Sequence, residues 1–179
     1  VDCGQFWKIS CWIRCLTCQV STACKKFETK FGYYPSDDLR YLRKGAGPAW
    51  KTDNGQNTGI ESLLVMVSQS TKGGTNLSGM RDKMTNTDAD KHGAPYPLLD
   101  DMTQRMDIAD GWNTPMVYFT KLNMKKSQLV VPAVDEAPVR VKARRREDGS
   151  YYGAKRFQIL SAGRDLTFGT DDDISFPSN

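Results

Sequence analysis

The sequence has one histidine, His92, and no cysteine after Cys24. A single imidazole excludes mechanisms that need two, which removes most catalytic zinc sites and the facial iron triad. There is no Gly-x-Ser-x-Gly elbow for a nucleophile, and no glycine-rich phosphate loop follows a predicted strand. Lys8 and Arg14 interrupt the apolar stretch from Phe6 to Val20, so we expect no membrane span, and the start of the sequence shows no signal-peptide pattern. These absences favour a non-enzymatic protein.

What the sequence does contain is enough apolar material for one folded domain. Its 179 residues are 39% hydrophobic and 10% aromatic, which excludes a disordered or collagen-like chain. The net charge of +4 is too small to indicate a nucleic-acid partner. One basic run, from Lys142 to Arg146, is typical of a solvated hairpin tip, so we expect no nucleic-acid binding.

The clearest periodic pattern lies at the start. Apolar residues there recur at alternating spacings of three and four, which predicts one stripe of a helix from about Gln5 to Phe31. Gly32 is a typical helix stop, and Pro35 prevents continuation. The residues of this stripe are Phe6, Ile9, Ile13, Leu16, Val20, Ala23, Phe27 and Phe31.

The five cysteines all lie within the first 24 residues. At 100° per residue, Cys11, Cys15 and Cys18 share one sector with Trp7, opposite the apolar stripe, whereas Cys24 points with the stripe. Three interpretations stay open at this point. The cysteines pack as small hydrophobes in helix contacts, form disulfides within or between chains, or hold a soft metal or cofactor through the Cys15-x-x-Cys18 spacing.

The rest of the sequence predicts an α+β fold in a single domain, 1–179. After the helix at 5–31, residues 32–115 hold short helices and a variable loop. Residues 116–179 then form a β-meander and an Asp-rich loop, with 157–160 as the last strand. We expect the long N-terminal helix to pack on a small antiparallel sheet.

Two acidic segments could bind a cation. The stretch from Ser161 to Ile174 carries Asp165, Asp171, Asp172 and Asp173 in a glycine-punctuated loop. Such carboxylates repel one another unless a cation, typically calcium, lies between them; alternatively, they are a solvated tail.

The second segment begins Asp88-Ala89-Asp90 and has Gly93 at the sixth place, as an EF-hand loop does. Leu99 stands at the twelfth place, where a bidentate Glu is required, so the segment is not an EF-hand. It is either a turn stabilised by Asx caps or a lesser cation site.

The order of several motifs resembles a known family. The helix ends in Phe-Gly-Tyr-Tyr-Pro, and Gly-Ile-Glu-Ser-Leu, Asp-Gly-Trp-Asn-Thr-Pro, Leu-Ser-Ala-Gly-Arg-Asp and Gly-Thr-Asp-Asp-Asp-Ile follow. Together, from about Thr17 to Ile174, they resemble the major pseudopilin of type II secretion systems and its type IV pilin-like relatives.

The resemblance implies a pilin-like fold and a non-enzymatic filament subunit that serves protein transport. Its partners would be other subunits of the homo-oligomeric filament, other pseudopilins and the secretion or pilus assembly machinery, in the periplasm or at the cell surface. The face with Trp7, Cys11, Cys15 and Cys18 would contact neighbouring subunits. The terminal loop would bind calcium through Asp165, Asp173 and either Asp171 or Asp172, with the backbone oxygen of Leu160 as a further ligand.

The sequence also departs from that family. The family's apolar N-terminal segment, which anchors the subunit in the inner membrane before assembly, is absent here, as in a soluble form lacking its anchor or in a relative that works without it. The cysteines and the excursion from Ser70 to Pro97 lie outside the family pattern. Two alternatives therefore stay open: an extracytoplasmic, calcium-stabilised binding or adhesion module that does not assemble, and a cysteine-ligated metal or redox protein.

Overall fold

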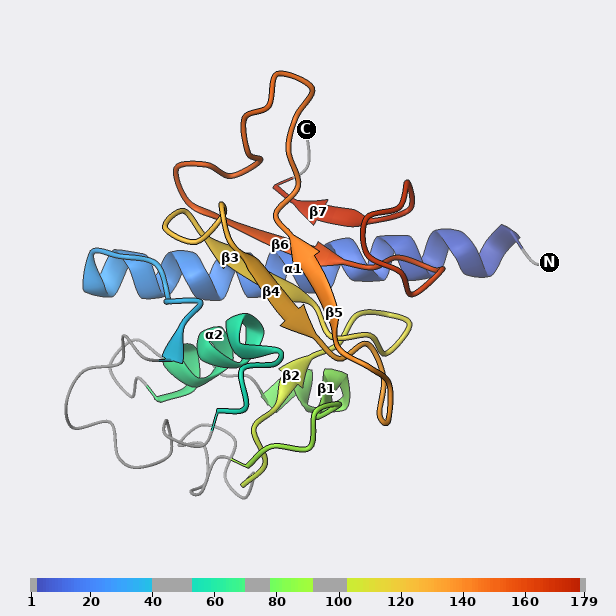
Figure 1. Cartoon of the computed structure of the whole chain (residues 1–179), viewed down its shortest axis with the longest axis horizontal. Coiled ribbons are helices and arrows are strands. Elements are labelled where there is room, and N and C mark those ends of the chain that lie inside the picture. Colours follow the sequence, from blue (N-terminus) through green and yellow to red (C-terminus); the bar gives the residue numbers. More distant parts are fainter. Residues whose placement is uncertain (1–2, 40–52, 70–77, 92–102, 178–179) are drawn as a thin grey trace.

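The computed structural model of the chain describes residues 3–39, 53–69, 78–91 and 103–177 (Figure 1). Side chains are described from Leu16 onward, with the exception of Gln69. Two α-helices, a 3-10 helix and seven short strands make up the described part of the chain.

The first helix, α1 (Cys3–Phe31), ends where the sequence predicts. Gly32 takes the left-handed conformation, with φ of +79°, and its N–H donates to the carbonyl oxygen of Glu28 at 2.7 Å. This is the usual glycine stop, because glycine adopts a positive φ without steric cost. The predicted orientation of Cys24 is confirmed, since its side chain is fully buried with the apolar stripe.

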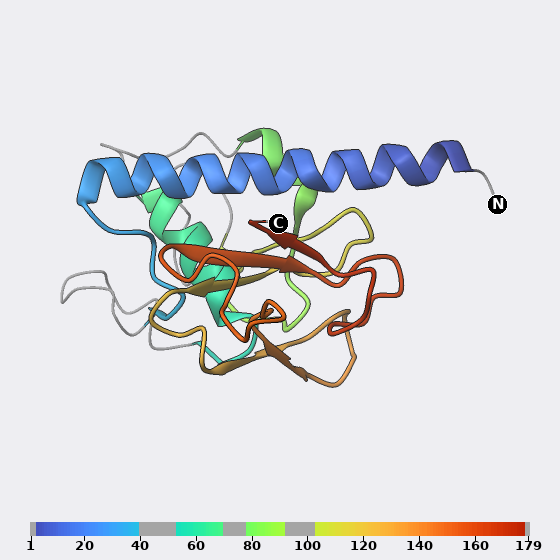
Figure 2. The same cartoon turned by 90° about the horizontal axis from the view of Figure 1, so that it is seen from above.

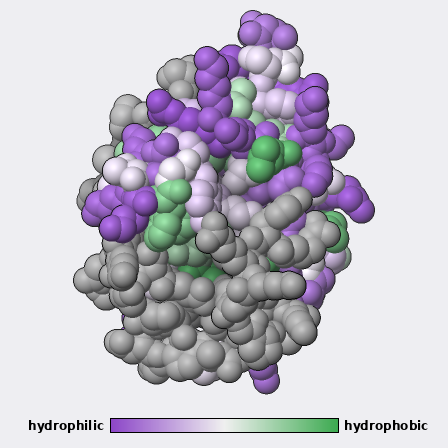
Figure 3. All heavy atoms as spheres, turned by 90° about the vertical axis from the view of Figure 1, so that its left-hand side faces the viewer, coloured by the Kyte–Doolittle hydropathy of each residue, from purple (hydrophilic) through white to green (hydrophobic). Residues whose placement is uncertain are grey.

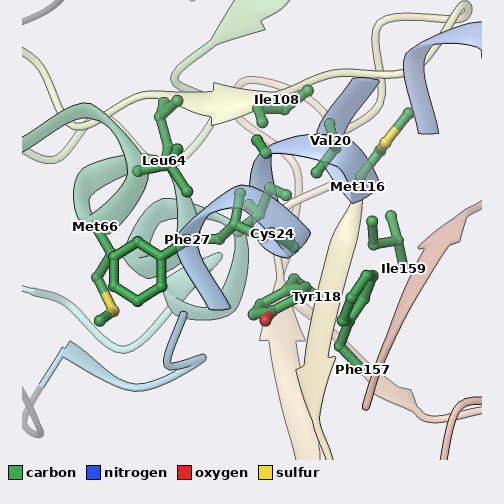
Figure 4. Close-up of a cluster of buried hydrophobic side chains, with 14 of the residues drawn as sticks. Val20, Cys24, Phe27, Leu64, Met66, Ile108, Met116, Tyr118, Phe157 and Ile159 are labelled. Carbon is green, nitrogen blue, oxygen red and sulfur yellow. The ribbon is translucent and has the colours of Figure 1, made fainter. Parts of the chain in front are cut away.

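The second helix, α2 (Thr58–Gln69), packs beside α1. Its apolar residues include Ile60, Leu63 and Leu64, which share one hydrophobic core with Val20 and Phe27 of α1. Figure 4 shows Leu64 of α2 and Phe27 of α1 in this core, together with side chains from the neighbouring strands. The two helices therefore bury their apolar faces partly against each other.

The strands form three separate antiparallel sheets. The first joins β1 (Met84–Thr85), which follows the 3-10 helix η3 (Ser78–Lys83), to β2 (Asp107–Ile108). The second has the order β3-β6-β7 and comprises β3 (Val117–Thr120), β6 (Phe157–Ser161) and β7 (Ile174–Phe176). The third pairs β4 (Ser127–Val130) with β5 (Val139–Lys142).

The sheet β3-β6-β7 lies between α1 and the β4-β5 hairpin (Figure 2). Its side chains alternate between two cores, as the pleat requires. Tyr118 and Ile159 join the core shared by the helices, whereas Val117, Phe119 and Leu160 join a second core under β4 and β5. The hydroxyl of Tyr118 donates to the carbonyl oxygen of Pro35 at 2.8 Å, which ties the turn after α1 to β3.

The predicted fold class is wrong. We expected one long helix packed on a single pilin-like sheet, but the described strands fall into three small sheets, and the element that α1 contacts most is α2. Among the described side chains of α1, those in the core run from Leu16 to Phe27. The physical reason is that the apolar face of α2 packs against the stripe of α1, so the sheet β3-β6-β7 shares that stripe with a second helix.

Two details of the predicted strand order are also corrected. The strands do not follow a meander, because β6 pairs with β3 across the inserted β4-β5 hairpin. Residues 157–160 are not the last strand, because β7 adds to the free edge of β6. None of the helices in the described part of the chain is both long and apolar enough to cross a membrane.

Candidate cation-binding sites

In the part of the chain that the structure describes, a group of carboxylates surrounds a buried arginine. Arg105 is fully buried, and its Nε lies 2.9 Å from Oδ2 of Asp90 and 3.9 Å from Oε2 of Glu61. Asp53, Asp88 and Asp107 also interact electrostatically with this pair of acids. We call these five acids and Arg105 the buried acidic cluster.

Three oxygens of the cluster are close enough to share one ion. One carboxylate oxygen each from Asp53, Glu61 and Asp90 lies within 4.8 Å of the other two. Among the residues that the structure describes, this is the one group of three or more His, Cys, Asp or Glu side chains that meets this distance. The arrangement could therefore hold a metal ion.

Among the residues that the structure describes, the five acids of the cluster are accompanied by one guanidinium, that of Arg105. Burial raises the pKa of Asp90 to about 7, against the partial compensation of Arg105. Burial, followed by repulsion from neighbouring aspartates, raises the pKa of Glu61 and of Asp107 well above the ordinary range. In the absence of another cation, these groups therefore favour the protonated form.

Several oxygens of the cluster accept no hydrogen bond from the residues that the structure describes. They are both carboxylate oxygens of Glu61, of Asp88 and of Asp90, together with Oδ1 of Asp107. Buried carboxylate oxygens normally have at least one partner, so each of these requires an explanation such as a proton or a bound ion.

The chain brings the acids together through the segment before α2. Oδ1 of Asp53 accepts from the N–H of Gly55 at 2.9 Å and from the hydroxyl of Thr58 at 3.1 Å, an Asx-type turn that opens the helix. Asn57 is the N-cap, because its carbonyl oxygen accepts from the N–H of Ile60. Glu61 then lies in the first turn of α2, facing Arg105.

The side chain of Asn57 joins this segment to its surroundings. Its Nδ2 donates to Oγ1 of Thr87 and to Oδ2 of Asp107, both at 2.9 Å, and its Oδ1 accepts from the N–H of Val131 at 2.9 Å. Asn57 has a φ of +49°, which asparagine tolerates better than most residues. The network closes three chain segments around the acids.

Sequence analysis missed most of the cluster. It named Asp88 and Asp90 as a turn or a lesser cation site, and the structure places Asp90 against Arg105. The missed signal was Glu61, the one charged residue in the helix α2. Asp53 and Arg105 carried no local signal, because only the tertiary fold brings them near Glu61.

The terminal Asp-rich loop closes mainly on its own backbone. Oδ2 of Asp172 accepts from the N–H of Arg164 at 2.7 Å and of Asp165 at 3.1 Å. Oδ2 of Asp173 accepts from the N–H of Gly169 at 2.8 Å, while its Oδ1 is buried and accepts no hydrogen bond among the described residues.

The electrostatics of the loop differ from one aspartate to the next. The hydroxyl of Thr170, which donates to Asp172, lowers the pKa of that exposed carboxyl. Burial raises the pKa of Asp173. Asp165 and Asp171 are exposed, and Leu160 lies in β6 with its side chain buried. The calcium site predicted at these residues stays a prediction.

The start of this loop is tied to the Trp112 turn. Asp110 accepts from the N–H groups of Trp112 and Thr114 at 2.9 and 3.0 Å, and from the hydroxyl of Ser161 at 2.6 Å. One buried carboxylate thus connects two of the motifs that carry the family resemblance.

The predicted subunit-contact residues are described only in part. Cys18 is a free, exposed thiol, and Cys24 is a free, buried one. Burial raises the pKa of the Cys24 thiol, which makes it a poor thiolate ligand. The side chains of Trp7, Cys11 and Cys15 lie outside the described ones, as does His92.

Comparisons with protein-family models, with curated proteins and with solved structures gave no match.

Proposed function

We propose that this chain is a non-enzymatic structural subunit of a type II secretion pseudopilus or type IV pilus-like filament. The observation that carries the proposal is α1, whose N-terminal turns extend past the rest of the chain in both ribbon views (Figures 1 and 2). Its 29 residues correspond to a length of about 43 Å. Such a helix offers a surface that the chain's own core does not cover.

The exposed thiol of Cys18 supports helix-to-helix contact between subunits. Cys18 lies on α1 between the buried residues Leu16 and Val20, and it faces away from the core. In a filament, this face of α1, with Trp7, Cys11 and Cys15, would pack against helices of neighbouring subunits. The further partners would be other pseudopilins and the assembly machinery, in the periplasm or at the cell surface.

On the face of the molecule shown in Figure 3, the described surface lacks the features of a subunit contact. The described residues on this face are mostly hydrophilic, and its hydrophobic residues occur in isolated groups. A stable subunit contact usually needs a more continuous apolar area. The described surface on this face therefore offers no continuous apolar area for a subunit contact.

Calcium would stabilise the rest of the domain through the terminal loop. Asp165, Asp171, Asp172 and Asp173 offer carboxylate oxygens, and Oδ1 of Asp173 is buried and accepts no hydrogen bond from the described residues. Calcium prefers six to eight oxygen ligands, including backbone carbonyls such as that of Leu160.

The proposal is tested by thiol labelling before and after assembly. The unaltered protein is labelled, and peptide mass spectrometry reports the modification of Cys18 and of Cys24 separately, so that Cys11 and Cys15 stay in the proposed contact face. We expect maleimide to label Cys18 in the monomer and to label it much more slowly in sedimented filaments, because the helix face becomes buried.

Two controls test whether slower labelling of Cys18 comes from burial of this helix face. Cys24 is fully buried and should stay unlabelled in both states. A Leu122→Cys variant, at a position that is 78% exposed, should react equally in both. Filaments in which Cys18 reacts as fast as in the monomer would refute the assigned contact. A chain that stays monomeric at all concentrations, with calcium present, would favour the non-assembling binding module.

A further inference from the structure

The buried acidic cluster has features that the filament proposal does not use. Glu61 is fully buried, lies within ion-sharing distance of Asp53 and Asp90, and accepts no hydrogen bond from the described residues. A carboxylate in this position requires a positive charge or a proton close by. Arg105 supplies one positive charge among five acids, with its Nε at 3.9 Å from Glu61.

The spacing of the oxygens is compatible with a single divalent cation. Two ligands on opposite sides of a calcium ion, each at about 2.4 Å, lie about 4.8 Å apart, whereas opposite ligands of magnesium lie about 4.1 Å apart. The oxygens of Asp53, Glu61 and Asp90 lie within 4.8 Å of one another. This upper limit admits either ion; calcium is favoured because magnesium dehydrates reluctantly and is rarely held by protein carboxylates alone.

The donor set matches the same choice. All three side chains offer carboxylate oxygens, which are hard ligands that suit calcium and magnesium better than softer metals. Asp53 is half-buried, so one of the three carboxylates is partly accessible to solvent.

We propose that Asp53, Glu61 and Asp90 form a calcium site inside the domain, separate from the terminal Asp-rich loop. The bound ion connects the segment that opens α2 to the turn after β1, because Asp53 and Glu61 belong to the first and Asp90 to the second. It offsets the repulsion between these acids while Arg105 stays paired with Asp90. The site does not depend on the filament function.

Calcium titration by calorimetry tests the site in a background that lacks two of the four terminal-loop aspartates. In that background, Asp165→Ala and Asp173→Ala remove the two aspartates predicted as the best ligands of the loop. We expect calcium to bind and to raise the thermal midpoint, and magnesium to bind more weakly. Adding Glu61→Gln, which keeps the shape of the side chain, should weaken calcium binding by at least about tenfold.

Asp53→Asn provides a second variant that preserves the fold. Asparagine is also a good Asx-turn residue, so it can still accept from the N–H of Gly55 while it removes the charge. We expect it to weaken calcium binding without lowering the thermal midpoint in chelator. Asp82→Asn is the matched control, because Asp82 is an exposed acid next to Lys83 and should leave calcium binding unchanged.

Two results would overturn the proposal. One is calcium binding in the Glu61→Gln and Asp53→Asn variants as tight as in their background. The other is no calcium binding in the background at all, which would mean that protons neutralise the cluster. Neither result bears on the labelling of Cys18, so the site and the filament function fail separately.

Discussion

Replacing Asn57 should destabilise the domain strongly, because its side chain is shared by three chain segments. In Asn57→Ala, the buried N–H of Val131 and the buried carboxylate of Asp107 both lose a hydrogen-bond partner. Each orphaned group costs about 1–3 kcal/mol. Alanine at a φ of +49° adds about 1 kcal/mol of backbone strain. The expected loss is therefore about 3–7 kcal/mol, a large part of the total stability of a typical domain.

Urea unfolding with an unchanged m-value is the assay for this loss. Asn57→Asp should be at least as damaging at neutral pH, because it keeps the shape but adds a carboxylate beside Asp107. Asn54→Ala is the control, since its side-chain bonds are solvent-exposed, and it should cost less than about 1 kcal/mol. A loss below about 1 kcal/mol in Asn57→Ala would refute the view that this residue holds the segments together.

Three further variants or conditions test the packing and the charge of the domain. Gly59→Ala should destabilise it measurably in urea, because the new Cβ would lie 2.5 Å from the carbonyl oxygen of Tyr118, whereas Gly79→Ala, which meets nothing within 4 Å, should not. Phe27→Ala should cost about 3–5 kcal/mol by urea unfolding through the cavity left in the core. In chelator, the free energy of unfolding should fall as the pH rises from about 4 to 7. The reason is that the pKa of Asp90 is higher in the folded chain than in the unfolded one, so protonation of Asp90 stabilises the folded state at low pH. That stabilisation is lost as the pH rises past about 7. A flat profile would contradict this last expectation.

Local signals in the sequence were sufficient for the ends and faces of single elements. Gly32 ends α1 because glycine alone takes a positive φ at no cost, and Cys24 faces the core because its helical phase matches Val20 and Phe27. Such features depend on residues within a few turns of one another, which a periodic pattern records.

The arrangement of the strands could not be read in the same way. β6 pairs with β3 rather than with β5, the strand that precedes it in the chain. β7 follows directly after the acidic run that was predicted as a loop, so it was not predicted as a strand. Pairing depends on which faces the two cores bury, and Tyr118 and Val117 join different cores although they are neighbours. The local sequence pattern does not show which residues of a strand belong to which of the two cores.

The candidate site shows the same limit. Glu61 and Arg105 lie 3.9 Å apart in space, but 44 positions separate them in the sequence. The run of aspartates from Asp171 to Asp173 led to the prediction of a cation site in the terminal loop. Neighbouring positions in the sequence do not by themselves place carboxylate oxygens around one ion. A lone buried acid in an apolar helix was the better signal, since burial of an unpaired charge is costly enough to need a reason.

Counting the calcium ions bound per chain tests the central claim most directly, namely that cations hold this domain together. Equilibrium dialysis against excess radioactive calcium should find one ion at the terminal loop and one at the buried acidic cluster. Glu61→Gln should lose one of these ions and keep the other, and Asp173→Asn should do the reverse. A chain that binds no calcium, or one whose count is the same in both variants and the unaltered protein, would contradict the account.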